Sequence, residues 1–291
     1  MATPAQWWHG ARPRTLPAAL APVAVGSGVA AYEGSFVAPK ALLALVVALA
    51  LQVGVNFAND YSDGVRGTDA DRVGPMRLVA SGGAAAETVK KAALGMFALA
   101  AGCGLVLVVS TQQWWLLLVG VAAIAAAWYY TGGRSPYGYR GLGELSVFVF
   151  FGLVAVMGTA YVQTETLTRL AFVTAVPVGL LASALLVVNN LRDIPTDEVS
   201  GKVTLAVRLG ASKTRVLYVS MMVAPLVAGV AIAVTWTEWA LLTLLALVPA
   251  VPPVGAVANG ATGRDLVPAL RDTGFTQLVF GLTLALGLAL A

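Results

Sequence analysis

Acidic and amide side chains recur at a spacing of four residues in two separate segments of the sequence. Residues four apart lie on one face of a helix. Carboxylate and amide oxygens that converge from two helices form a site for a hard cation, and proteins commonly hold Mg²⁺ with one or two carboxylates plus the phosphates of a substrate. The spaced residues are Asn56 with Asp60 and Asn59 with Asp63 in the first motif, and Asn189, Asp193 and Asp197 in the second motif.

The predicted chemistry is that of a Mg²⁺ site that binds a phosphorylated substrate. Its metal ligands are expected among Asp60, Asp63, Asp193, Asp197, Asn56 and Asn189. The four aspartates and Lys202 are the predicted catalytic residues. Pro195 disfavours helical geometry at Ile194 and removes a backbone donor, so the sequence leaves open whether Asp197 shares a face with Asp193.

Basic and amide side chains are interleaved with both motifs and suit the charge of a diphosphate, because Arg offers bidentate donors to phosphate oxygens. The predicted substrate-binding residues are Arg14, Asn56, Asn59, Arg66, Arg72, Arg77, Asn189, Asn190, Arg192 and Arg208. Lys202 is expected to neutralise either the diphosphate or another substrate anion. The alternative, a run of solvated loop charges, is disfavoured because the N-x-x-x-D pattern occurs twice, at equivalent ends of two predicted helices.

An aromatic and glycine-rich segment, WYYTGGRSPYGY, runs from Trp128 to Tyr139. Two interpretations of it stay open. Its rings, with Tyr130 and Tyr139 as the candidates for substrate binding, could line a pocket or stabilise a cation by their faces. It could equally be an aromatic belt at a membrane interface followed by a glycine turn.

The elements that must position these residues are membrane helices. Of the 291 residues 58% are apolar and only 11% are charged, whereas soluble domains carry about a quarter charged residues. A spanning helix needs about 20 mostly apolar residues. Nine runs approach that length: Leu16–Tyr32, Ala41–Phe57, Ala92–Ser110, Trp114–Thr131, Leu145–Val162, Leu170–Val188, Val216–Thr235, Trp239–Val257 and Phe275–Ala291. We expect one all-α integral membrane domain over residues 1–291, in which the first four helices and the next four are related by an internal duplication.

The basic residues predict how the chain lies in the membrane. With nine spans, 16 of the 18 lysines and arginines fall on the side of the N-terminus, and only Lys40 and Arg169 fall on the other side. The positive-inside rule then predicts a cytoplasmic N-terminus, an external C-terminus and an active site toward the cytoplasmic face. This division also accounts for the net charge of +4 without nucleic acid as a partner.

Three stretches resemble the UbiA superfamily of intramembrane prenyltransferases. They are the start RPRTLP at Arg12–Pro17, the run NDYSD at Asn59–Asp63 with DRVGP at Asp71–Pro75, and NLRD at Asn190–Asp193 followed by GKVTLAVRLG at Gly201–Gly210. The resemblance implies a nine-helix bundle in a bacterial cytoplasmic membrane, with Mg²⁺ as the cofactor and a polyprenyl diphosphate as one substrate. GKVTLAVRLG and RPRTLP are most similar to the branch that prenylates 1,4-dihydroxy-2-naphthoate in menaquinone biosynthesis.

The resemblance also implies a reaction. The allylic C–O bond of the diphosphate breaks, the naphthoate ring attacks the allylic cation, and loss of CO₂ restores the aromatic ring. Two alternatives stay open: another aromatic acceptor, such as 4-hydroxybenzoate, and a secondary transporter. The transporter is disfavoured because transporters place their charged residues near the middle of the bilayer, whereas the acidic residues here cluster at helix ends.

Overall fold

The computed structural model describes residues 2–67 and 77–291, and every regular element in them is a helix. Within these residues nine helical rods can be traced. They are α2 (Pro17–Tyr32), α3 (Ala38–Arg66), α4 (Ala86–Thr111), α5 (Leu116–Tyr129), the rod of α6 (Gly143–Val147), η3 (Phe148–Val154) and α7 (Ala155–Thr164), α8 (Arg169–Val199), α9 (Leu205–Thr235), the rod of η4 (Glu238–Ala246) and α10 (Leu247–Ala258), and η5 (Gly263–Asp265) with α11 (Leu266–Ala289). The short α1 (Pro4–Ala11) and η1 (Pro13–Thr15) precede α2, and η2 (Tyr137–Arg140) precedes α6.

The predicted all-α membrane fold is confirmed. Among the described residues, seven rods are long and apolar enough to cross a membrane. The segment Pro4–Thr15 and α2 together make an eighth candidate, bent by 51°. The remaining rod, α5, is apolar but has 14 residues, fewer than the roughly 17 to 20 of a typical span. Each of the nine predicted apolar runs falls on one rod, which is compatible with nine spans; the internal duplication stays a prediction.

Both motifs are helical, and not loops. Helix α3 continues beyond the predicted apolar run to Arg66, and Gly67 then ends it in the left-handed conformation with φ 74°. Helix α8 likewise continues through Pro195 to Val199. The apolar run ends where the chain leaves the lipid, but a helix ends only where its backbone hydrogen bonds stop, so hydropathy underestimates both helices. As a result, the aspartates project from the ends of membrane helices.

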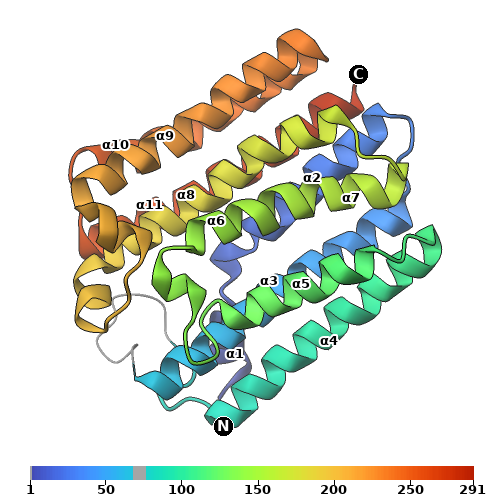
Figure 1. Cartoon of the computed structure of the whole chain (residues 1–291). Helices are drawn as coiled ribbons and strands as arrows, with labels where there is room; N and C mark the ends of the chain where they lie inside the picture. The colour runs from blue at the N-terminus through green and yellow to red at the C-terminus, as the bar shows by residue number, and fades with distance from the viewer. Residues whose placement is uncertain (1, 68–76) are drawn as a thin grey trace.

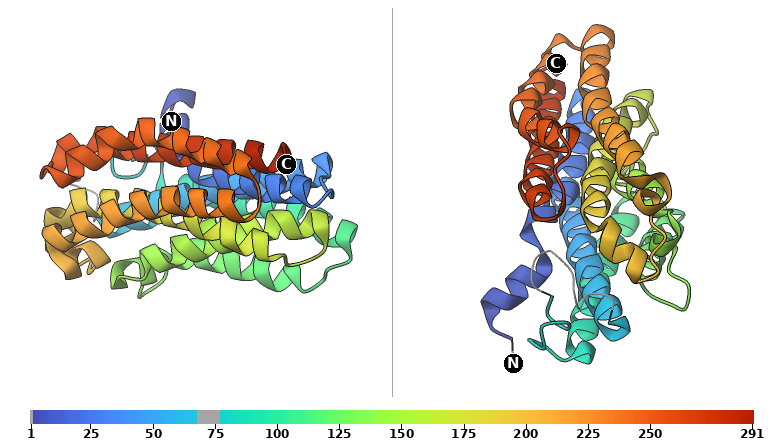
Figure 2. Two further views of the ribbon diagram at one scale, coloured as in Figure 1. Left: turned by 90° about the horizontal axis from the view of Figure 1, so that it is seen from above. Right: turned by 90° about the vertical axis from the view of Figure 1, so that its left-hand side faces the viewer.

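The rods lie side by side along a common direction, with α8 in contact with α2, α9, α11 and the α6–α7 rod (Figures 1 and 2). Small residues allow the closest approaches, as in many membrane helix pairs. A Cβ on Gly152 would stand 2.5 Å from the Cα of Gly179, so the α6–α7 rod and α8 touch backbone to backbone there. This contact fixes the position of the second motif relative to the α5–α6 connection.

One end of the bundle carries the N-terminus and the functional segments, and the C-terminus lies at the opposite end (Figure 1). The end with the N-terminus holds the last turns of α3 and α8 and the α5–α6 connection, residues 130–142. Since consecutive rods run in opposite directions, the second and sixth predicted spans, which are α3 and α8, both finish at this end. The fold thus brings the two motifs, separated by more than a hundred residues, to one side of the bundle.

Candidate active site

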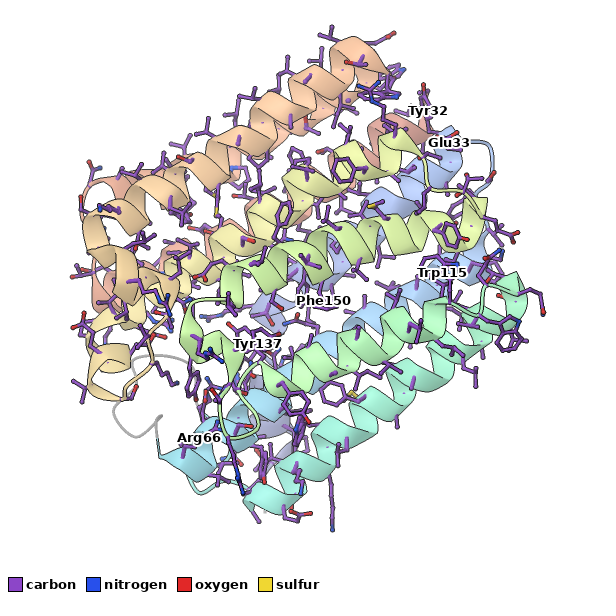
Figure 3. All side chains as sticks on the ribbon, viewed as in Figure 1. Tyr32, Glu33, Arg66, Trp115, Tyr137 and Phe150 are labelled. Atoms are coloured by element: carbon purple, nitrogen blue, oxygen red, sulfur yellow. The ribbon has the colours of Figure 1, made fainter. Side chains whose placement is uncertain are left out.

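A cavity of about 1700 Å³ begins at the end of the bundle where the motifs lie. Apart from Thr159, its polar lining residues define what is called here the polar end: His9, Arg12, Arg14, Thr15, Gln52, Asn56, Asn59, Arg77, Tyr130, Tyr137, Ser146, Asn189, Arg192, Arg264 and Arg271. The rest is mostly apolar and continues between α2, α3, α4, α5 and the α6–α7 rod as far as Leu116 and Val162. Figure 3 shows Tyr137, Phe150 and Trp115 in this order along the molecule, from the polar end toward the other end. The shape suits a ligand with an anionic head and a long hydrocarbon tail.

Asp60 of the first motif anchors the chain that follows α3. Its carboxylate accepts hydrogen bonds from the backbone N–H groups of Leu78 and Val79, at 2.8 and 3.0 Å, and its side chain is buried. Arg12 is close enough to act on it electrostatically. Each carboxylate oxygen keeps further acceptor capacity, so Asp60 can still meet a cation while it holds the returning chain.

Asp63 is the point where the two motifs and the α5–α6 connection meet. Its carboxylate accepts a hydrogen bond from the Tyr139 hydroxyl. Arg77 Nη2 lies 3.6 Å from Oδ2, and Lys202 Nζ lies 3.7 Å from Oδ1. All three charged side chains are buried or nearly so, which strengthens their interaction relative to water.

Lys202 reaches this point because α8 ends directly before it. Gly201 adopts a left-handed φ of 74°, which favours glycine, and turns the chain. The Lys202 N–H then donates to the Asp197 carbonyl at 2.9 Å, and the next N–H, of Val203, donates to the Tyr139 carbonyl at 2.9 Å. The ammonium group lies 4.8 Å from the centre of the Tyr139 ring, within cation–π range.

In the second motif, Asp193 forms a bidentate pair with its neighbour Arg192, with N–O distances of 2.6 and 2.7 Å. Arg192 also donates to the Asn189 side chain at 2.9 Å. Asp193 and Asp197 are both buried on the same continuous helix despite Pro195. Arg192 and Asn189 line the cavity, so the pair stands directly at its polar end.

Several predicted substrate-binding residues form hydrogen bonds within the protein, to backbone carbonyls or to other side chains. Asn56 donates to the Ala11 carbonyl and the Thr15 hydroxyl at 2.9 and 3.0 Å, and Asn59 accepts from Thr131 at 2.7 Å. The other contacts of this kind are Arg66 with the carbonyls of Thr131 and Gly133, Arg208 with the Arg140 carbonyl at 3.0 Å, and Asn190 with Glu144 at 2.9 Å. The exposed Arg66 and Arg208 thus clamp the α5–α6 connection from its two sides.

The other predicted site residues divide between the cavity wall and the shell around it. The cavity lining includes Arg14, Asn56, Asn59, Arg77, Tyr130, Asn189 and Arg192. The four aspartates, Lys202 and Tyr139 are not among the lining residues; the aspartates and Lys202 are buried. Arg72 lies outside the described residues. The substrate-binding roles stay predictions.

The donor set fits Mg²⁺ when a substrate supplies the remaining ligands. Within residues 2–67 and 77–291, no three acidic, His or Cys side chains lie close enough together to hold a metal on their own. Mg²⁺ in phosphate-transfer sites, however, typically takes one or two carboxylates and completes its shell with phosphate oxygens and water. The oxygens for such an ion would come from buried carboxylates of two helices, Asp63 of α3 and Asp193 of α8, which are paired with Lys and Arg.

Sequence reasoning missed two parts of the site. Tyr137 donates to the Ala126 carbonyl at 2.8 Å and shares a 2.8 Å hydrogen bond with Ser146 at the cavity wall. Burial raises the pKa of the Tyr137 phenol, so this group stays protonated. The second part is Glu144, which is buried in α6. Only the aromatic density of residues 128–139 indicated this region.

Comparison with known proteins identifies the family of this chain. The profile of the UbiA prenyltransferase family matches residues 19–264. A protein of Mycobacterium tuberculosis named 1,4-dihydroxy-2-naphthoate octaprenyltransferase is 53% identical over 99% of this chain and 98% of its own length. A protein of the same name from Mycobacterium leprae is 52% identical over 100% of this chain and 98% of its own.

Among solved structures, a UbiA homolog from Archaeoglobus fulgidus bound to GPP and Mg²⁺ has the same fold. The TM-score is 0.71 at 13% identity, over 98% of this chain and 100% of that one. The family profile covers most of the chain, the relatives are similar over nearly their whole length, and the helical architecture agrees. The chain therefore belongs to the UbiA prenyltransferase family.

Proposed function

We propose that this protein transfers a polyprenyl group from its diphosphate to 1,4-dihydroxy-2-naphthoate with loss of CO₂, which gives a demethylmenaquinol. The observation that carries the proposal is the identity of 53% and 52%, over at least 98% of both chains, to two proteins named for this acceptor. The cavity supports it, because it joins a cationic end to a long apolar space. Family membership leaves the transporter alternative without support.

The prenyl diphosphate binds with its charged end among the basic side chains of the polar end and its chain in the apolar part of the cavity. Arg77 and Arg192 line the cavity, and each is paired with an aspartate of one motif. Guanidinium groups can donate bidentately to phosphate oxygens. Lys202 adds a third positive charge behind them, beside Asp63.

The cofactor would be Mg²⁺, and the residues that would hold it are Asp60 and Asp63 of the first motif and Asp193 and Asp197 of the second, with Asn56 and Asn189 as further candidates. The support is the oxygen donor set and the Mg²⁺ in the homolog of the same fold. When bound, the ion supplies a positive charge that stabilises the departing diphosphate. The arginines and Lys202 stabilise the same charge through preorganised donors.

The chain's own residues then favour departure of the leaving group and control the allylic cation. The C1–O bond breaks and its electron pair leaves with the diphosphate, which stays among Arg77, Arg192 and Lys202. Tyr130 and Tyr137, whose rings pack edge to face at 5.6 Å, line the cavity beside this point and present π-electron density to a cation. The ring carbon that carries the carboxylate forms the new bond, and CO₂ departs with restoration of the aromatic ring.

The orientation in the membrane is part of the proposal. The chain is placed in a bacterial cytoplasmic membrane, with the N-terminus and the active site toward the cytoplasm and the C-terminus outside. The support is the division of basic residues, 16 to 2. In the structure Lys40 and Arg169 begin α3 and α8 at the end of the bundle away from the motifs. The acceptor and the diphosphate would thus be drawn from the cytoplasmic leaflet.

The test is the product of the purified enzyme in detergent, given a prenyl diphosphate and equal amounts of 1,4-dihydroxy-2-naphthoate and 4-hydroxybenzoate. We expect only the prenylated naphthoate, at a mass that lacks CO₂. A naphthoate labelled with ¹³C in its carboxyl group should release all of the label in step with prenylation. Label retained in the product, or prenylated benzoate as the main product, would assign the chain to another acceptor.

A further inference from the structure

Glu144 is a buried acidic residue that the proposed mechanism does not use. It is the second residue of α6, and its exposed fraction is 5%. Its Oε1 accepts a hydrogen bond from Asn190 at 2.9 Å, and its backbone carbonyl accepts one from Ser183 at 3.1 Å. Its Oε2 is also buried and has no hydrogen-bond partner among the described residues.

A buried carboxylate oxygen without a donor is unfavourable, and it gains from any donor that a ligand brings. The prenyl diphosphate brings none, because its head is an anion with acceptor oxygens and its tail is hydrocarbon. The aromatic acceptor brings two phenolic O–H groups. The hydroxyl-bearing acceptor is therefore the substrate whose chemistry matches Glu144.

Tyr130 connects Glu144 to the cavity. Tyr130 lines the cavity, and its hydroxyl oxygen lies 3.1 Å from the position that a Cβ of Gly143 would take. The Tyr130 hydroxyl is thus next to the backbone that carries Glu144. Ser146, two residues further along the same rod, also lines the cavity. A substrate O–H bound at this wall would donate to the Tyr130 oxygen, and this would leave the Tyr130 O–H to donate toward Glu144.

We propose that Glu144, acting through Tyr130, forms the subsite that receives a ring hydroxyl of the aromatic acceptor. The inference rests on the proposed function. Glu144 is a positioning residue: its Oε2, unpartnered among the described residues, is a hydrogen-bond acceptor, which favours a phenolic O–H at this wall over the acceptor's carboxylate or the diphosphate. The hydrogen bond also increases the electron density of the ring. Asn190 lies on the helix of the second motif, three residues before Asp193. Its hydrogen bond to Glu144 fixes the position of Glu144 relative to that motif.

The test compares the wild-type enzyme with Glu144→Gln on three acceptors: 1,4-dihydroxy-2-naphthoate, 1-hydroxy-2-naphthoate and 4-hydroxy-2-naphthoate. Glutamine keeps the shape and can still accept from Asn190, but it presents an N–H donor where Oε2 stood. The readouts are the Kd of each acceptor, followed by naphthoate fluorescence, and the kcat and KM of each substrate. Ser183→Ala is the matched control, because it removes a hydrogen bond to the Glu144 backbone and leaves the carboxylate in place.

One naphthoate hydroxyl should prove coupled to Glu144. Wild type should bind the analogue that lacks this hydroxyl about 10- to 100-fold more weakly than the full acceptor, as expected for a hydrogen bond to a charged group. In Glu144→Gln the Kd of the full acceptor should rise by a similar factor, while the Kd of that analogue should change little. The KM of the diphosphate should stay unchanged. Glu144→Asp, which keeps the charge, should recover part of the coupling.

The inference would be overturned if Glu144→Gln weakened the binding of all three acceptors equally, or if Ser183→Ala gave the same pattern as Glu144→Gln. Glu144 would then have a structural role or bind a buried water. Thermal unfolding in detergent separates loss of the fold from loss of the subsite. If Glu144→Gln does not fold, the same comparison of the three acceptors is made with Glu144→Asp. If wild type fails to prenylate 1,4-dihydroxy-2-naphthoate, the proposed function fails. If wild type succeeds and the coupling is absent, only this inference fails.

Discussion

The Tyr139 hydroxyl donates a hydrogen bond to the Asp63 carboxylate, and this contact joins the α5–α6 connection to the first motif. Two cations lie within cation–π range of the same ring: Arg66 at 5.6 Å and Lys202 at 4.8 Å from its centre. A single tyrosine thus contacts the first motif through its hydroxyl and the segment after the second motif through its face. Its position lets a change at either motif reach the other.

Replacement of Tyr139 should therefore separate the two roles of this side chain. Tyr139→Phe keeps the ring and removes the hydrogen bond to Asp63, and we expect kcat/KM to fall by about 10- to 100-fold. Tyr139→Leu also removes the cation–π contacts, and its kcat/KM should be lower by about a further 3- to 10-fold. The measurement is prenylated naphthoate formed under conditions limited by the diphosphate.

The control for this pair is Tyr161→Phe. Tyr161 donates to Gln113 at 2.9 Å and accepts from Trp115 at 3.3 Å, at the end of the bundle away from the motifs. Its loss should cost about 1 kcal/mol of stability and leave kcat/KM unchanged. Wild-type activity in Tyr139→Phe would mean that Asp63 needs no orientation by the connection.

Removal of the metal should abolish turnover. Activity is expected to disappear in EDTA and to return with Mg²⁺, because the diphosphate then loses the charge that stabilises its departure. Asp63→Asn and Asp193→Asn should each lower kcat by at least about a thousandfold, since each takes a carboxylate from one of the two motifs. Glu238→Gln, exposed at the opposite end of the bundle, is the control.

Metal binding itself can be followed without turnover. Mn²⁺ should bind to wild type in the presence of a non-hydrolysable prenyl diphosphate, as measured by electron paramagnetic resonance, and much more weakly to Asp193→Asn. Undiminished activity in EDTA would contradict the assignment of both motifs.

The helical spacing of the aspartates was predictable, but the length of their helices was not. Asn56 and Asp60 share a face of α3, as the spacing of four predicts. The apolar run, in contrast, stops at Phe57 because it reports contact with lipid, whereas the helix continues to Arg66. At Pro195 the predicted disturbance does not end the helix, because a proline removes one hydrogen bond while the turns on both sides keep theirs.

The contacts that the long side chains make could not be predicted from the sequence. Arg66 and Arg208 carry the charge that a diphosphate needs, yet both donate to backbone carbonyls of the α5–α6 connection. Arg208 and its acceptor are 68 residues apart in the chain, and only the packed helices bring them together. Glu144 illustrates the same limit, because only its contact with Asn190 of α8 reveals that it is buried.

The orientation predicts which ends of the bundle are accessible from outside the cell. Glu33 and Asn259 are exposed and follow α2 and α10 at opposite ends of the bundle, and Cys103 is the only cysteine to remove first. In a Cys103→Ser background, a membrane-impermeant maleimide should label Glu33→Cys in intact cells. It should label Asn259→Cys only after the cells are opened. Labelling of both in intact cells would contradict the division of basic residues as a guide to topology.

The last prediction concerns which anion Lys202 stabilises, the diphosphate or the carboxylate of the acceptor. Its ammonium group lies 3.7 Å from Asp63, on the side of the first motif, and it is buried. We therefore expect Lys202 to stabilise the diphosphate as charge develops on it. A contact made mainly in the transition state lowers kcat when it is lost, whereas a contact made equally in the ground state raises only KM. Lys202→Ala should thus lower kcat by about 100-fold or more at saturating levels of both substrates. Lys202→Arg should retain a larger share of the wild-type kcat, because the charge remains while the geometry changes. A variant whose only defect is a raised KM for the naphthoate would instead assign Lys202 to the acceptor carboxylate.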